Sequence, residues 1–252
     1  METSSIWTSF KKDLGYATAS IQYIELSRRI ADDVHGCMLE GKSIRDAARQ
    51  YGLSVSELPE DFSLRIAKSY IIQVHSCVER FLENFRHLIG SPTYGLEIEK
   101  KDNLLHLTLQ KVPIPVEKSK EYNQLFRICD YYRYVRNEIV HSGEAGIGLR
   151  QSYGALSGFR DDKLNAPNMI DCICFDDQVL YARSARALLE AIYFRSQYDW
   201  PLIVEKNKAK IKTITQKCLN ESEKTTQKIQ YYLRQSYPIP PTGIPDLLEL
   251  LK

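Results

Sequence analysis

Three side chains near the middle of the chain have the types and the spacing needed to cleave RNA. Arg136, Asn137 and His141 fall within two turns at the end of an amphipathic helix, which the apolar spacing predicts over residues 118–140. On such a helix Asn137 and His141 are i and i+4 neighbours, and Arg136 flanks their face. We therefore expect the three side chains to edge one pocket.

The chemistry of these three groups is complementary. An imidazole titrates near neutral pH, so His141 can accept the proton of a ribose 2′-hydroxyl or protonate the leaving oxygen. The Arg136 guanidinium is always charged and can stabilise the extra negative charge of a phosphorane-like transition state. The Asn137 amide can orient the histidine or hold a phosphate oxygen. This scheme needs no metal ion, and we expect no cofactor.

The six residues from Arg136-Asn137 to His141 resemble the Arg-x4-6-His signature of the HEPN superfamily, in its common form with asparagine after the arginine. The stretch 78–85 looks like the family's first core helix, with the acidic Glu79 inside an apolar run. The resemblance covers residues 63–200 and implies a bundle of four or five helices. It also implies a dimer in which two copies of the motif face each other, with metal-independent endoribonuclease activity.

The same resemblance implies roles for single residues and for the whole protein. Arg136 and His141 would be catalytic and Asn137 supporting, while Glu79 would orient Arg136 from a neighbouring helix. Proteins of this kind serve as toxins or effectors in bacterial defence against phage, under an antitoxin or activator protein. Gly143 stands where toxins silenced by nucleotidylation carry a tyrosine, so this mode of control is in doubt here.

Aromatic and basic residues beside the motif suggest contacts with single-stranded RNA, including tRNA. Tyr131 and Tyr134 can stack on bases, and Arg127 and Arg133 can bind phosphates. The alternative is that Tyr132 faces the core and leaves Tyr131, Arg133 and Tyr134 as an exposed or dimer-facing surface. Seven lysines between residues 206 and 228 form either a further RNA-binding surface or a solvated helix face.

The elements that must position these residues are mainly helical. Apolar spacing predicts helices over 21–39, 63–89, 118–140, 178–195 and a basic one over 202–232, with Asp176 and Asp177 capping the fourth. Alternation on both sides of a polar turn predicts a hairpin over 96–109, the glycines of 143–158 predict a loop, and 170–175 fits a short strand or a loop. We therefore expect an all-α, HEPN-like helical bundle with a small β-hairpin insertion. Its segments would be 1–62, a core of 63–200 and a basic tail of 201–252.

Two other function classes compete with the nuclease. Residues 43–58 resemble helix-turn-helix segments of the Psq type, but Glu57, Glu60 and Asp61 are unsuited to a helix that reads DNA. This segment would otherwise be a helical hairpin that packs on the bundle or on a partner. The second alternative is a noncatalytic helical adaptor, in which the same fold supplies a dimer or partner surface.

The composition of the 252 residues excludes several classes. A net charge of +2 is too small to indicate a polyanion partner by itself, and scattered cysteines, including the lone pair Cys172 and Cys174, give no disulfide framework or zinc pattern. No nucleotide-binding glycine loop and no serine-hydrolase motif is present. No stretch approaches the ~20 apolar residues of a membrane span, and the amino terminus lacks the apolar core of a signal peptide. We therefore expect a cytoplasmic protein that does not bind membranes.

Overall fold

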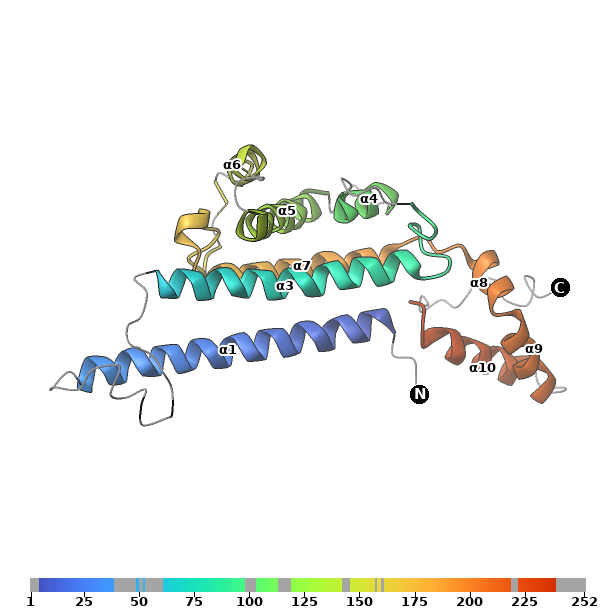
Figure 1. Cartoon of the computed structure of the whole chain (residues 1–252). Helices are drawn as coiled ribbons and strands as arrows, with labels where there is room; N and C mark the ends of the chain where they lie inside the picture. The colour runs from blue at the N-terminus through green and yellow to red at the C-terminus, as the bar shows by residue number, and fades with distance from the viewer. Residues whose placement is uncertain are drawn as a thin grey trace. The chain divides into compact units, whose positions relative to one another are not determined.

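The computed structural model describes most of the chain as helices. The described residues are 5–38, 49, 52, 61–97, 103–112, 119–141, 146–156, 158–159, 161–218 and 222–238. The elements are α1 (Ile6–Met38), α3 (Phe62–His87), α4 (Leu104–Lys111), α5 (Ser119–His141), α6 (Gly146–Gly154), the 3-10 helix η2 (Ile170–Cys172), α7 (Phe175–Arg195), α8 (Trp200–Lys206), α9 (Lys208–Lys217) and α10 (Ser222–Arg234) (Figure 1). Within these ranges there is no strand, and the expected all-α class is confirmed.

The three helices with the clearest apolar spacing are confirmed within a few residues. They are α3, α5 and α7, predicted over 63–89, 118–140 and 178–195. The first helix of the chain begins at Ile6 rather than at Ile21, because Trp7, Phe10 and Leu14 extend its buried face. The helix-turn-helix expected over 43–58 lies outside the described residues, apart from positions 49 and 52.

The expected β-hairpin is wrong in its second half. Residues 104–109 belong to helix α4, which begins after the cap residue Asn103. The Asn103 Oδ1 atom accepts the Leu105 N–H at 3.1 Å, as a helix cap requires. The buried residues of α4 are Leu105 and Thr108, three positions apart. The buried positions therefore follow a helical spacing, although the sequence alternates between apolar and polar residues.

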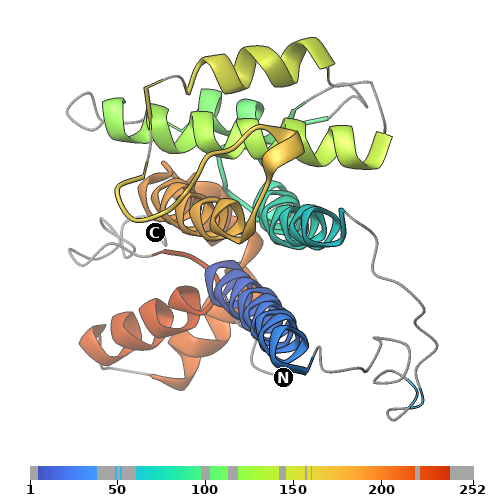
Figure 2. The same ribbon diagram turned by 90° about the vertical axis from the view of Figure 1, so that its left-hand side faces the viewer.

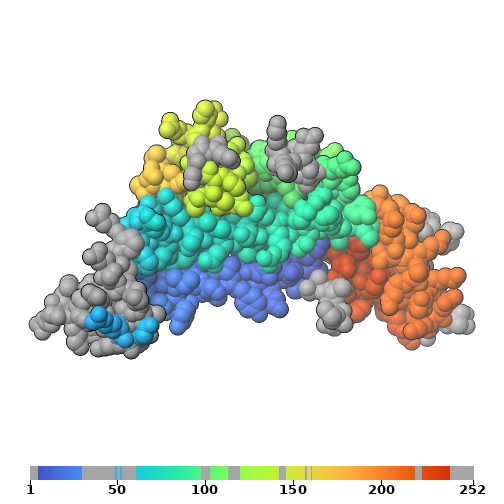
Figure 3. Space-filling model, in the orientation of Figure 1, coloured from blue at the N-terminus to red at the C-terminus, as the bar shows by residue number. Residues whose placement is uncertain are grey.

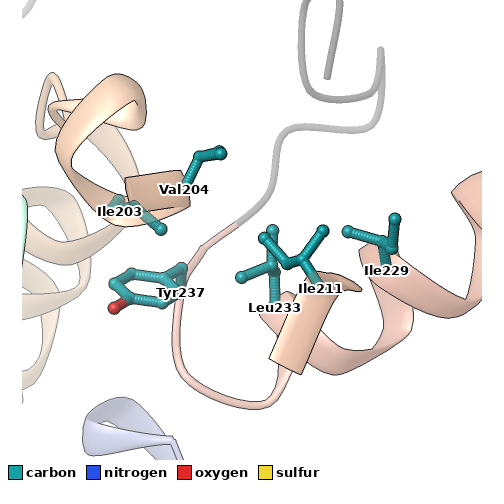
Figure 4. Close-up of a cluster of buried hydrophobic side chains, with 6 residues drawn as sticks. All are labelled: Ile203, Val204, Ile211, Ile229, Leu233 and Tyr237. Atoms are coloured by element: carbon teal, nitrogen blue, oxygen red, sulfur yellow. The ribbon is translucent and has the colours of Figure 1, made fainter. Parts of the chain in front are cut away.

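The single basic helix expected over 202–232 is also wrong, because it is divided into α8, α9 and α10. Asn207 ends α8, its Nδ2 atom donating to the Ile203 carbonyl at 2.8 Å and its Oδ1 atom accepting from the Tyr232 hydroxyl at 2.8 Å. Figure 4 shows the apolar cluster that this folding assembles, formed by Ile203, Val204, Ile211, Ile229, Leu233 and Tyr237. A single straight helix would leave most of this surface in water, which costs about 25 cal/mol per Å².

Two segments in which the sequence predicted a loop, or either a strand or a loop, contain short helices. The glycine-rich stretch after α5 includes α6, where Gly148 packs directly on the Tyr134 ring. A Cβ at Gly148 would lie 2.6 Å from that ring, so the absence of a side chain allows the contact. The segment left open between strand and loop, 170–175, contains η2 and the start of α7.

Contacts divide the chain into two units that alternate along the sequence, and the expected division at residues 62 and 200 stays a prediction. The first unit comprises Met1–Asp13, Ser76–Phe126 and Ala185–Lys252, and the second comprises Leu14–His75 and Arg127–Ser184. In the first unit, aromatic rings of α1, α3 and α7 pack together, with Trp7 and Phe81 at 6.3 Å and Phe81 and Tyr193 at 6.3 Å between centroids.

The core of the second unit contains two tyrosines and a histidine that come from three helices. Tyr132 of α5 stacks on Tyr181 of α7 at 4.9 Å, and the Tyr181 hydroxyl lies 2.6 Å from the His75 Nδ1 atom of α3. All three side chains are buried. The side-by-side course of α3 and α7 is visible in Figures 1 and 2.

One buried carboxylate of α1 is held by two arginines of the next turn. Glu25, 6% exposed, accepts hydrogen bonds from Arg28 at 3.0 and 2.9 Å and from Arg29 at 2.8 Å. The hydrogen bonds from Arg28 lower the pKa of Glu25 below its ordinary value of 4.5, although burial acts in the opposite direction. The charged form of Glu25 is therefore the form that stabilises the folded state.

We expect the stabilisation by Glu25 to disappear in acid. Because the pKa is lower in the folded state than in the unfolded one, the stabilisation is present above pH 4.5 and is lost as pH falls through the folded-state value. The difference in unfolding free energy between the wild type and Glu25→Gln, measured by urea denaturation, should shrink below pH 4.5. Glu190→Gln, at an exposed position of α7, is the control. A Glu25→Gln difference that is constant down to about pH 3 would contradict the prediction.

Gly90, which connects α3 to the following turn, is expected not to tolerate alanine. Its φ is 76°, and a Cβ there would lie 2.5 Å from Cγ1 of Ile203 and 2.9 Å from the Asp199 carbonyl oxygen. Gly95 has a similar φ of 74° but no atom within 4 Å of its Cβ position, so it is a matched control. In urea denaturation, Gly90→Ala should lower the free energy of unfolding by about 1–3 kcal/mol more than Gly95→Ala does. Equal losses would show that the close approach of α8 has no energetic role.

Candidate functional site

The motif residues occupy the last turns of α5, which remains helical up to His141. Arg136 and Asn137 are half-buried, and His141 is exposed. The Arg136 Nη1 atom donates a hydrogen bond to Asn137 Oδ1 at 3.1 Å. Asn137 thus contacts Arg136, whereas we expected it to contact His141 or a phosphate oxygen.

Helix geometry points the Arg136 and His141 side chains in different directions from α5. In a regular helix, residues five apart are separated by about 140° around the axis and by about 7.5 Å along it. Asn137 and His141 share a face, being about 40° apart. Among the described residues the exposed His141 makes no hydrogen bond and no ion pair. The motif therefore presents a linked Arg136–Asn137 pair and a separate histidine.

Glu79 lies in a different part of the structure. It is exposed on α3 and belongs to the first unit, whereas the end of α5 belongs to the second. Its expected role in orienting Arg136 stays a prediction.

The proposed RNA-contacting side chains divide into buried and accessible ones. Tyr131 is 0% exposed and donates its hydroxyl to the Asn168 carbonyl, so the expectation that it stacks on bases or lies at the surface is wrong for this chain. Tyr134 is half-buried under the guanidinium of Arg133, which lies 4.0 Å from the ring centroid. Arg127 is exposed and donates to the Ala155 carbonyl at 3.5 Å.

A buried carboxylate fixes α5 in the second unit. Asp177, 0% exposed, accepts the Tyr132 hydroxyl at 2.8 Å, the Asn168 N–H at 2.8 Å, the Asn168 Nδ2 atom at 2.9 Å and the Cys174 N–H at 2.9 Å. Burial, followed by the charge of Asp177, raises the pKa of Tyr132 well above its ordinary range, so the phenol stays a donor. Cys174 is the residue just before α7, so the hydrogen bond from its N–H to the Asp177 side chain is one half of a capping box. Asp177 therefore does cap this helix, although α7 begins earlier than expected.

The described residues contain no group of three or more histidine, cysteine or acidic side chains arranged to hold a metal ion. Cys77, Cys129 and Cys218 are buried free thiols, and burial raises the pKa of Cys129 strongly. No helix of the described ranges combines the length and the apolar character needed to cross a membrane.

Comparisons of the chain with protein-family models, with curated proteins and with solved structures found no match. Functional inference therefore rests on the residues and the geometry of this chain.

We expect Asp177→Asn to destabilise the protein by about 2–4 kcal/mol, because an amide has one acceptor atom where four donors converge. Asp176→Asn is the matched neighbour. Within the described ranges the Asp176 side chain accepts one hydrogen bond, from the Asn165 N–H at 2.9 Å, so its loss should lower the free energy of unfolding by about 1 kcal/mol. Tyr132→Phe should cost about 1–2 kcal/mol, since it removes one of the four donors. Chemical denaturation followed by circular dichroism measures all three. Similar losses at positions 176 and 177 would contradict a special role for the buried carboxylate.

Proposed function

We propose that the protein is a metal-independent endoribonuclease of the HEPN type, with its site at the end of α5. The observation that carries the proposal is that Arg136, linked to Asn137 at 3.1 Å, and the exposed His141, which makes no hydrogen bond within the described ranges, lie within two turns of one helix end. A fixed guanidinium and an accessible imidazole are the two groups needed to cleave RNA through its own 2′-hydroxyl.

In the proposed reaction the RNA supplies the nucleophile. His141 removes the 2′-hydroxyl proton, the 2′-oxygen attacks the adjacent phosphorus, and the bond to the 5′-oxygen breaks as that oxygen takes up a proton. Arg136 neutralises the extra charge in the transition state, and Asn137 holds the guanidinium in place. The products are a 2′,3′-cyclic phosphate, which can open to a 3′-phosphate, and a 5′-hydroxyl end.

The divergence of Arg136 and His141 on one helix supports a homodimer in this proposal. Because the two side chains are about 140° apart, a second motif from another copy would supply the group that one helix cannot bring to the same phosphate. Glu79 would orient Arg136, and Arg127, Arg133 and Tyr134 would contact the RNA strand, with tRNA among the substrates.

The proposed cellular role is that of a cytoplasmic toxin or effector in bacterial antiphage defence, held by an antitoxin or activator protein. Gly143 has no hydroxyl, so nucleotidylation two residues after the histidine cannot silence it.

A noncatalytic adaptor is the second candidate, and exposed apolar side chains beside the motif favour it. Val140 is 47% exposed and Ile147 is 77% exposed, which suits a protein-binding surface. In that case His141 would be dispensable for biological activity.

Cleavage of total tRNA and of a labelled single-stranded RNA in EDTA tests the nuclease. We expect the wild type to cut RNA, His141→Ala to lose about 10²–10⁴-fold in rate and Arg136→Ala about 10²–10³-fold. DNA of the same sequence should stay intact, because it lacks the 2′-hydroxyl nucleophile. The RNA fragments should end in cyclic phosphate.

His87→Ala and Arg186→Ala are the controls, since both replace exposed side chains of the same types in the first unit, whereas the motif belongs to the second. They should cleave at the wild-type rate. Equal cleavage by all variants, or cutting of DNA as fast as RNA, would overturn the proposal. A wild type that is inactive alone and with its copurifying partner would favour the adaptor.

A further inference from the structure

A cavity of the second unit carries charged groups that the proposed nuclease reaction does not use. It lies between α1, the start of α3 and the segment 171–176, and its volume is about 390 Å³. Figures 1 and 2 show η2, drawn in gold, beside the start of α3, and the space-filling view of Figure 3 shows these two segments at the surface. Small-molecule sites have volumes of roughly 300–1,000 Å³, so this cavity is of a size to hold one.

The α1 wall of the cavity is positively charged and held in place. Arg28 and Arg29 both line it, and both are bound by the buried Glu25 carboxylate described above. Two guanidiniums against one carboxylate leave one positive charge on this wall. The Nη1 and Nη2 atoms of Arg29 make no hydrogen bond among the described residues, and its side chain is 60% exposed. Such fixed, forked donors suit phosphate oxygens.

The α3 wall adds donors of the same kind. Ser63 and Leu64 line the cavity in the first turn of this 26-residue helix, and this first turn contains no acidic residue. The N–H groups of a first helical turn have no partner within the helix, and the helix dipole favours an anion there. The Ser63 hydroxyl lies 3.5 Å from the Arg28 Nη1 atom, so the hydroxyl and the guanidinium face the same space.

The third wall has the opposite charge. Asp171 and Asp176 line the cavity, and Asp176 also accepts the Asn165 N–H at 2.9 Å. Asp171 is exposed and has no partner in the described part of the chain. The lining as a whole therefore joins an anion-binding wall to a wall of acceptors, which suits a ligand with a phosphate at one end and hydroxyl or amino groups at the other.

Two residues with buried polar atoms lie one helical turn away in sequence from lining residues of the cavity. Among the described residues the Tyr70 hydroxyl and both polar atoms of the Gln178 side chain make no hydrogen bond, although the residues are 1% and 0% exposed. Tyr70 follows the lining residue Ala67 by three positions, and Gln178 follows Phe175 by three. Such atoms are uncommon in folded proteins and call for a ligand or water. Burial, and next the charge of Glu25, raises the pKa of Tyr70, as expected for a hydroxyl near the ion pair.

We propose that this cavity binds a nucleoside monophosphate, with the phosphate on Arg28, Arg29 and the first turn of α3, and the ribose or base donors on Asp171 and Asp176. The volume favours a nucleotide over inorganic phosphate, which would fill only a small part of it. The site contains no residue of α5, so it is separate from the proposed nuclease motif and does not depend on it.

Calorimetric titration of the full chain with the four nucleoside 5′-monophosphates tests the proposal. The protein carries His141→Ala, so that the nuclease proposal has no bearing on the result. We expect saturable binding of at least one nucleotide, with the matching nucleoside and inorganic phosphate each at least about tenfold weaker. Arg29→Gln should weaken nucleotide binding at least about tenfold. Asp171→Asn should weaken the nucleotide and leave inorganic phosphate unchanged.

Arg65→Gln is the matched control, because Arg65 is an exposed arginine of α3, paired with Asp61, that does not line the cavity. The nucleotide affinity of the Arg65→Gln variant should stay within about twofold of that of the protein without this change. Arg29→Lys keeps the positive charge but loses the forked donors of the guanidinium. Circular dichroism verifies that each variant is folded. The proposal is overturned if no nucleotide binds below about 1 mM, if the nucleoside binds as tightly as the nucleotide, or if Arg29→Gln and Arg65→Gln weaken binding equally.

Discussion

The Asp177 carboxylate is the contact on which the second unit depends. It is fully buried and, among the described residues, has no cation beside it, so its charge is balanced by four hydrogen bonds alone. Those bonds come from the middle of α5, from the loop around Asn168 and from the residue that starts α7. Tyr131 adds a further bond from α5 to the same loop. With Tyr131 and Tyr132 both fixed, the rotation of α5 about its axis is determined, and with it the direction in which Arg136 and His141 leave the helix.

The start of α7 serves both candidate sites. Cys174 donates its N–H to Asp177, and the same residue lines the cavity together with Phe175. The turn that fixes the motif helix therefore also forms one wall of the proposed nucleotide site. On the α1 wall, the buried Glu25 carboxylate holds two arginines from the next turn of its own helix, whereas Asp177 also accepts from Tyr132 of another helix. Each site is thus arranged by a buried carboxylate, and Glu25 itself also lines the cavity.

Where sequence patterns failed, they did so because of how side chains pack. The alternating leucines of 104–109 suggested a strand, yet the Asn103 cap and the burial of Leu105 and Thr108 produce α4. The lysine-rich stretch 202–232 has the composition of one long helix, but burial of Ile211 against Ile229 and Leu233 requires it to fold back at Asn207 and Cys218. Periodicity shows which face of a helix is apolar, but it does not show whether another part of the same chain packs against that face.

The sequence by itself determined the helices α3, α5 and α7 and placed the motif at a helix end, because apolar spacing and terminal glycines are local signals. It also supplied the chemical types of the motif, since an arginine, an asparagine and a histidine act through their own functional groups. Only the tertiary structure decided that Tyr131 is buried and that Glu25 organises a cavity. The Tyr131 bond joins residues 37 positions apart, and the cavity joins three separate segments. Contacts over such distances depend on how whole helices pack, which no local pattern encodes.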